Sequence, residues 1–247
     1  MMRSFGNHTF NMKNYLNHLG QMYNKRTFIR KMNYLDYNFP KIFKDIGSKN
    51  ISVLEIGPGM GECIKFLNSK GINKIDIVDN DKHVLDNAKK NFKIQKSILS
   101  NDITSIDKKL GNYNLIIMIQ VLEHTPTEQY KKIIQILYKH LIKGGYIVIV
   151  VPNANNPLGL VERYGDLQHH TSFTEQSLKD LVNVSGVKDF ELRVDGYEIP
   201  PYDIVNIIRI IFQKILHLFL YLLLIINGGI YFKTMTPNIS LIIKKKS

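Results

Sequence analysis

Residues 53–62 read VLEIGPGMGE, an apolar run that passes directly into a glycine-rich turn. Such a turn after a buried strand lets a ligand approach the backbone closely, because glycine has no Cβ. The helix that follows offers free N–H groups at its N-terminus. The glycines lie at 57, 59 and 61, so the G-x-G-x-x-G spacing of a dinucleotide site is not met. Glu55 would repel a pyrophosphate and suits a cationic ligand.

Short apolar runs alternate with helical stretches after this turn. Continuous runs such as IIMI and IVIVV are typical of strands covered on both faces. The alternation predicts an α/β fold with a mostly parallel seven-stranded sheet and helices on both faces. The expected strands are 51–56, 74–78, 96–99, 113–119, 146–151, 187–194 and 238–243, and the expected helices are 62–69, 82–92, 128–141, 174–185 and 204–226. Asp81 and Thr174 are the expected N-caps of two of these helices, the second without a capping box.

We expect a single domain over residues 1–247. It consists of an N-terminal helical cap (1–50, with helices broken at Pro40), a core (51–194), a hydrophobic insertion (195–235) and the last strand (236–247).

Composition limits the function classes. The chain has 247 residues, of which 44% are apolar, and this is enough for a buried core. Lys+Arg 33 minus Asp+Glu 21 gives a net charge of +12. The excess comes from 27 Lys with only 6 Arg, whereas proteins that read bases favour Arg, so we expect no specific nucleic-acid binding. The single cysteine, Cys63, excludes a disulfide framework and fits a reducing, cytoplasmic compartment. The first 20 residues lack the apolar run of a secretory signal.

The segment 204–226 is rich in Ile, Leu and Phe but carries polar residues at 206, 209, 213 and 217, which form one stripe on a helix. Two interpretations stay open: a helix buried in the fold or covered by a partner, and a helix lying in a membrane interface. A membrane span is disfavoured, because one crossing would separate the strand 238–243 from its sheet.

The stretch VLEIGPGMG resembles the first motif of class I S-adenosylmethionine-dependent methyltransferases, and the resemblance covers roughly residues 50–194. It implies a Rossmann-like sheet and S-adenosylmethionine as the cofactor. It also implies that Glu55 lies near the methionine end of the cofactor, and that Gly57, Pro58 and Gly59 form the loop beneath it.

Two further sites follow the second and third strands. Asp79 lies about 20 residues beyond the glycine turn, where a carboxylate can accept both ribose hydroxyls. Asn80 could add a hydrogen bond, and the alternative for Asp79 is a loop or N-cap aspartate. The resemblance implies that Asp102 binds the adenine amino group and that Ile103 packs on the ring; the alternative is a solvated turn.

Residues 119–124, IQVLEH, resemble the fourth motif in the small-molecule branch of the family and imply that Gln120 lies near the methionine end. The Asp/Asn-Pro-Pro-aromatic tetrad of base amino-methyltransferases is missing here, and Cys63 lies in the wrong place for base C5 methylation.

The loop 152–178 is similar to that of methyltransferases of bacterial lipopolysaccharide and capsule biosynthesis. We expect no metal at His169 and His170, because adjacent side chains diverge. Each is either a structural histidine or a substrate contact.

The resemblance implies methyl transfer to a small acceptor, with O-methylation of a sugar in surface polysaccharide biosynthesis as the first choice. An anionic sugar derivative would suit the positive charge. A hydroxyl acceptor needs a base, for which His124, His169 and His170 are candidates and His124 is favoured. The alternatives are a quinone-type O-methyltransferase and a non-catalytic cofactor-binding module. The insertion would hold the enzyme at the inner face of the membrane or form a homodimer.

Overall fold

The computed structural model describes residues 25–47, 50–229 and 232–246. The first part of the expected helical cap, and the segment considered for a secretory signal, lie outside these residues. The strands are β1 (Ser52–Ile56), β2 (Lys74–Asp79), β3 (Lys96–Leu99), β4 (Tyr113–Ile119), β5 (Leu141–Pro152), β6 (Phe190–Gly196) and β7 (Asn238–Lys245). The α-helices are α2 (Lys25–Asn38), α3 (Pro40–Ile46), α4 (Glu62–Ser69), α5 (Lys82–Asn91), α6 (Tyr130–Lys139), α7 (Leu160–Tyr164), α8 (Glu175–Ser185) and α9 (Ile204–Ile226).

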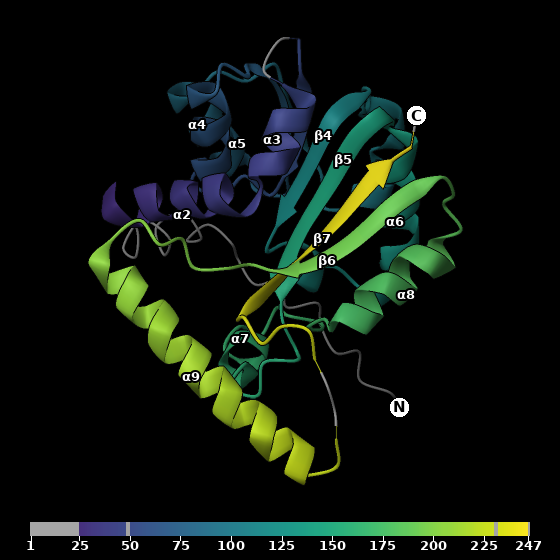
Figure 1. The fold of residues 1–247 in the computed structure, drawn as a ribbon. Coiled ribbons are helices and arrows are strands. Elements are labelled where there is room, and N and C mark those ends of the chain that lie inside the picture. The colour runs from purple at the N-terminus through teal and green to yellow at the C-terminus, as the bar shows by residue number, and fades with distance from the viewer. Residues whose placement is uncertain (1–24, 48–49, 230–231, 247) are drawn as a thin grey trace, which may run out of the picture.

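The seven strands form one sheet in the order β3-β2-β1-β4-β5-β7-β6 (Figure 1). The first five strands of this order are parallel, and β7 is antiparallel to both β5 and β6. The expected α/β fold with a mostly parallel seven-stranded sheet is therefore confirmed. The strand order reverses between β1 and β4, and ligands of open α/β sheets bind at the carboxyl ends of the strands beside such a reversal.

Helices cover both faces of the sheet, which explains why the strands are apolar without alternation. In β4, Ile116 belongs to the core on the side of α6 and α8, and Ile117 belongs to the core on the side of α2 to α5. The helical cap packs into the core on the side of α2 to α5 through Leu35, Phe39 and Ile42.

The expected element boundaries hold at some positions and shift at others. Asp81 caps α5 as expected, accepting a hydrogen bond from the His83 N–H at 2.7 Å. The expectation that Thr174 lacks a capping box is wrong. Ser177 completes the box: its hydroxyl accepts from the Thr174 N–H at 2.9 Å, the role that Glu or Gln usually takes. Helix α6 is shorter than expected, and β5 starts at Leu141.

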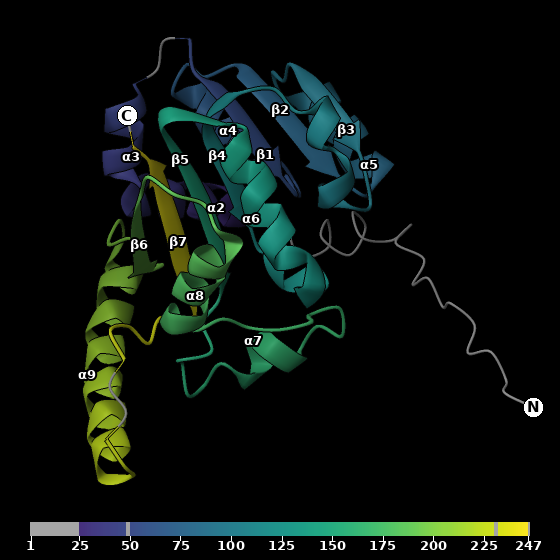
Figure 2. The same cartoon turned by 90° about the vertical axis from the view of Figure 1, so that its right-hand side faces the viewer.

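Helix α9 is not buried in the fold, so the prediction of a helix buried within this chain is wrong, while coverage by a partner stays a prediction. Of its residues only Asn206 is buried, while Phe212 is 66% and Ile226 is 82% exposed. The helix lies apart from the sheet and extends beyond it (Figure 2). Within the described ranges, α9 is the one helix long and apolar enough to cross a bilayer.

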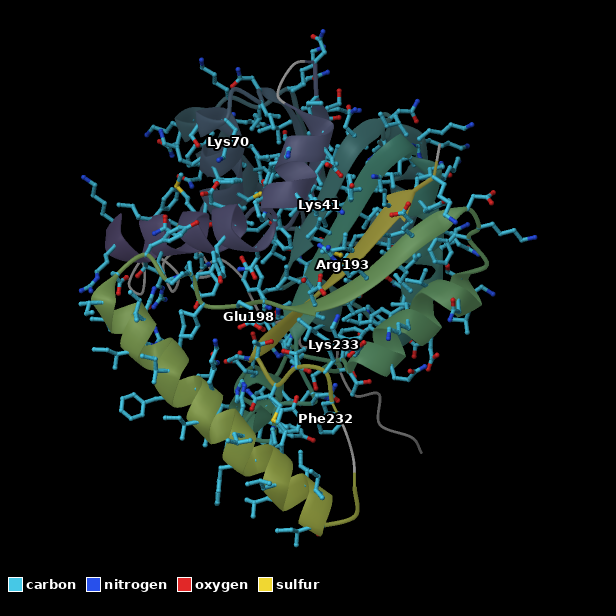
Figure 3. All side chains as sticks on the ribbon, in the orientation of Figure 1. Lys41, Lys70, Arg193, Glu198, Phe232 and Lys233 are labelled. Carbon is cyan, nitrogen blue, oxygen red and sulfur yellow. The ribbon has the colours of Figure 1, made fainter. Side chains whose placement is uncertain are left out.

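The polar stripe of α9 faces the protein. Asn206 donates to the carbonyl of Pro200 at 3.0 Å, and Gln213 and His217 are half-buried. The labelled Glu198, Phe232 and Lys233 lie on the sheet side of this helix, and its apolar side chains extend outward (Figure 3). The helix therefore presents its apolar surface to the outside, which reverses the usual arrangement.

Candidate active site

The glycine turn lies at the carboxyl end of β1. The Gly57 N–H donates to the Val78 carbonyl of β2 at 2.9 Å, and the Gly61 N–H donates to the Pro58 carbonyl at 2.8 Å. Gly57 has φ +71°, and a Cβ there would collide with the Val121 side chain from the end of β4. Gly57, Pro58 and Gly59 thus make a tight loop that touches the ends of the two neighbouring strands, and only glycine fits at its first position.

Glu55 lies beneath this loop and is 4% exposed. Burial raises the pKa of its carboxyl to about 8, and the Glu62 and Asp79 carboxylates act in the same direction, against a hydrogen bond from Cys63. Its Oε2 has no hydrogen-bond partner among the described residues. A buried acid with an unused oxygen and acidic neighbours is an environment that favours a cation.

Asp79 ends β2 next to the glycine loop. Its Oδ1 accepts from the Asp81 N–H at 2.8 Å, and burial raises the pKa of its carboxyl to about 6. Asp81, and not Asp79, is the N-cap of α5. Asn80 is exposed beside it. The structure therefore places a half-buried carboxylate at the carboxyl edge of the sheet, close to the loop.

Asp102 and Ile103 follow β3 in a short 3-10 helix (Ile103–Ser105). The Asp102 carboxylate accepts from both the N–H and the hydroxyl of Thr104, each at 2.7 Å. Ile103 is buried in the core on the side of α6 and α8. This cap explains the local backbone, and the adenine contacts implied by the resemblance stay a prediction.

Gln120 directly follows β4 and has φ +54°, which is unusual for a residue other than glycine. Its side-chain amide donates to Oδ1 of Asn238 at 3.0 Å, at the start of β7. Its N–H donates to the carbonyl of Val150 in β5 at 2.9 Å. Gln120 therefore ties the end of β4 to β5 and β7, and its predicted place near the methionine end is untested.

Three side chains converge after β4: Glu123, His124 and His169, called here the Glu123 cluster. Their ligand atoms all lie within 4.8 Å of one another. Glu123 is 0% exposed, and neither of its carboxyl oxygens has a hydrogen-bond partner among the described residues. Burial raises the pKa of this carboxyl to about 8. The rings of His124 and His169 meet edge to face with centroids 4.5 Å apart, and burial lowers the pKa of His124.

The segment that carries His169 is held by Arg163 of α7. Its guanidinium donates to the carbonyls of His169 at 2.6 Å and His170 at 2.8 Å. The His170 N–H donates to the carbonyl of Glu123 at 2.8 Å, while the His170 side chain is exposed. Of the three candidate histidines, the structure brings together His124 and His169 and leaves His170 outside the cluster.

Glu123 lies within the LEH stretch of the fourth motif, but the sequence alone assigns it no role. Its burial and its two unused oxygens depend on the loop that folds over it from residues 160–170, and this is not readable from local sequence. The LEH stretch itself was the signal that pointed to this place.

The glycine loop lies beside the reversal of the strand order, and the carboxylates of Glu55 and Asp79 lie at the same edge of the sheet. This arrangement is typical of α/β proteins that bind a ligand at the carboxyl ends of their strands. A family profile described as a methyltransferase domain matches residues 23–192. The chain belongs to this methyltransferase family, and the prediction of an enzyme of this class is confirmed. No curated protein matches the chain.

Solved structures share the fold. A SAM-dependent methyltransferase from Archaeoglobus fulgidus is 19% identical with a TM-score of 0.60, covering 90% of this chain and 97% of that chain. One from Clostridium acetobutylicum ATCC 824 is 13% identical with a TM-score of 0.61, covering 94% and 99%. The plantazolicin methyltransferase BamL, in complex with a triazolic desmethylPZN analog and SAH, is 17% identical with a TM-score of 0.60, covering 94% and 91%. The expected S-adenosylmethionine cofactor agrees with the family and with the SAH in that complex.

The buried Glu55 predicts a pH dependence of stability. Its folded pKa of about 8 lies above that of the unfolded chain, so the folded protein holds a proton that the unfolded chain releases. The free energy of unfolding therefore falls as pH rises from about 4.5 to about 8. Glu55→Gln removes this loss, and the variant should unfold at a Tm about 2–4 °C or more above wild type at pH 8, with a smaller difference at pH 5.

Differential scanning calorimetry of the ligand-free protein measures this difference. Glu128→Gln, on an exposed glutamate, is the control and should follow wild type at both pH values. If Glu55→Gln and wild type lose stability in parallel between pH 5 and pH 8, Glu55 does not carry the elevated pKa.

Proposed function

We propose that the protein transfers the methyl group of S-adenosylmethionine to a hydroxyl oxygen of a small acceptor, a sugar of a surface polysaccharide precursor. The observation that carries the proposal is the buried carboxyl of Glu55, which has an unused oxygen beneath the glycine loop. A cationic sulfonium nucleoside supplies the positively charged partner that this buried carboxylate lacks.

The cofactor would lie along the carboxyl edge of the sheet. In this proposal Glu55 holds its methionine end over the loop 57–59, and Asp79 accepts the ribose hydroxyls with Asn80 beside it. The other predicted contacts are Asp102 and Ile103 at the adenine and Gln120 near the methionine end. The sulfonium supplies the electrophilic methyl group, so the protein has to position the acceptor oxygen in line with the S–CH3 bond.

The acceptor would lie beside the Glu123 cluster, which follows β4 at the same edge of the sheet. The cluster offers the half-buried imidazole of His124, whose pKa is lowered because burial disfavours its charged form. We propose that activation of the acceptor depends on His124. His170, the third candidate, would contact solvent or the substrate from outside the cluster.

The acceptor class rests on charge and on the resemblance of the loop 152–178. A sugar linked to a nucleotide or lipid phosphate is anionic, and a net charge of +12 would attract it. A quinone-type acceptor is the second candidate, because the apolar surface of α9 could receive a hydrophobic molecule.

Asp79→Asn tests the cofactor site. The amide oxygen of the variant can still accept the hydrogen bond from the Asp81 N–H. The neutral side chain is nevertheless a weaker acceptor for two ribose hydroxyls than the carboxylate. We expect SAH affinity to fall by about 1–3 kcal/mol in isothermal titration calorimetry. Asp86→Asn on α5 is the control and should bind as wild type does. Equal affinity of the two variants would dismiss the ribose contact.

Turnover tests the acceptor. We expect SAH production with a nucleotide-linked sugar and none with a polyprenyl phenol, measured by mass spectrometry. His124→Ala should lower turnover by about tenfold or more while SAH affinity is kept, because the residue acts on the acceptor. Near-normal turnover of His124→Ala rejects its role, and turnover on the phenol alone favours the quinone-type reaction.

We also propose that α9 lies in the interface of an anionic membrane. Its outer surface is apolar along its whole length and includes the exposed Ile208, Phe212, Ile215 and Phe219. Arg209 and Lys214 are exposed toward the protein side, near Tyr34 and Glu198. The strands on either side of α9 in the chain, β6 and β7, pair with each other, so both ends of the helix stay on one side of a bilayer. A helix lying in the membrane surface can bury its apolar side while both of its ends stay on one side of the bilayer, and a spanning helix cannot.

Liposome flotation tests the role of α9. The full-length protein should float with anionic vesicles, and the Phe212→Asp/Phe219→Asp variant should stay at the bottom of the gradient. Val184→Asp changes an exposed apolar residue of α8 and is the control that should float. No flotation of wild type removes the membrane proposal. Sedimentation of wild type as a dimer and of the double variant as a monomer would instead assign α9 to a homodimer.

A further inference from the structure

The Glu123 cluster has the donor set of a metal site. Two imidazoles and one carboxylate come from two separate segments, the turn after β4 and the loop after α7, and meet with their ligand atoms within 4.8 Å. Imidazole and carboxylate together suit divalent transition metals such as zinc, cobalt, manganese or iron.

The hydrogen bonds of the two histidines leave suitable lone pairs free. The Nδ1 of His169 lies 2.7 Å from the carbonyl of Glu162, which can only accept, so Nδ1 is the donor and Nε2 is the nitrogen available to an ion in the neutral ring. The Nδ1 of His124 is buried without a hydrogen-bond partner among the described residues. Metal-binding histidines are typically held as His169 is, with the second ring nitrogen bonded to a carbonyl.

Glu123 gives an independent indication of a missing partner. Its side chain is fully buried, yet neither oxygen accepts a hydrogen bond from the residues that the structure describes. An unpaired buried carboxyl costs free energy that a bound cation would recover. Glu162 and Asp166 add negative charge around it, and Arg163 is occupied by the carbonyls of His169 and His170.

We propose that Glu123, His124 and His169 bind one divalent transition-metal ion at the carboxyl edge of the sheet. The sequence predicts no metal site, and this proposal departs from that prediction at His169, although the adjacent His169 and His170 still do not form a metal pair. The exposed His170 takes no part, and the second imidazole comes from His124, which lies 45 residues earlier in the chain.

Three protein ligands leave open positions for an acceptor, and this consequence rests on the proposed function. A hydroxyl bound to the ion has a lowered pKa and releases its proton to water. Its oxygen then forms the new O–CH3 bond as the S–CH3 bond breaks, and the electron pair of that bond stays on sulfur as a neutral thioether. In this reaction His124 acts as a ligand of the ion rather than as the base.

Titration of the chelator-treated, full-length protein with Co²⁺ tests the site. We expect one ion per chain, with the visible absorption bands of bound cobalt and displacement by Zn²⁺. Mg²⁺ should not compete, because it prefers six oxygen ligands. His169→Ala and Glu123→Gln should each weaken cobalt affinity by about tenfold or more.

His170→Ala is the matched control, because it removes the neighbouring histidine without removing a donor. Its cobalt affinity should equal that of wild type. Absence of the absorption bands in wild type overturns the proposal, and so does equal loss of affinity in His169→Ala and His170→Ala. SAH affinity, measured on every variant, reports whether it has folded. Wild type that binds SAH and no cobalt contradicts the metal site alone, whereas failure to bind SAH contradicts the proposed function.

Discussion

The uncompensated burial of Glu55 is the constraint on which the candidate site depends. The carboxyl lies at the end of a central strand, beneath a loop fixed by bonds to β2 and by contact with the end of β4. A folded chain keeps a buried acid without a cationic partner only at a cost in stability. The rest of the edge, from Asp79 on β2 to the turn after β4, is arranged around the place where a positively charged ligand would offset that cost.

Most of the fold could be predicted from the sequence, because burial on both faces makes each central strand a continuous apolar run. The runs 113–119 and 146–151 both correspond to strands of the sheet, and the glycine turn at 57 marks the carboxyl edge. The predicted ends of helices and strands differ from the structure where two adjacent elements could each include the same residues. Leu141 was predicted as the end of a helix and lies in β5, because pairing with Tyr113 overrides its helical pattern.

The parts of the site that escaped prediction depend on contacts between distant segments. The sequence pointed to His124 and His169 separately, but the fold of the loop after α7 decides that they meet over Glu123. The same holds for α9. Its periodicity predicts an amphipathic helix, and the usual rule would turn the apolar face inward. Here the polar stripe faces the protein instead, with Asn206 bonded to the carbonyl of Pro200 and with Gln213 and His217 half-buried.

The position of β7 has a consequence for how the chain is made. This strand lies between β5 and β6 and pairs with both, yet it is synthesised after β5, β6 and α9. Until it emerges, β6 has no neighbour in the sheet and the edge of β5 is open, while the apolar α9 is already synthesised. Closure of the sheet is therefore a late step that joins segments far apart in sequence, and such joining is slow. During this interval the nascent chain exposes the unpaired edge of β5 and the apolar surface of α9 at the same time. Both are surfaces that chaperones bind, and the apolar helix could also bind a lipid surface.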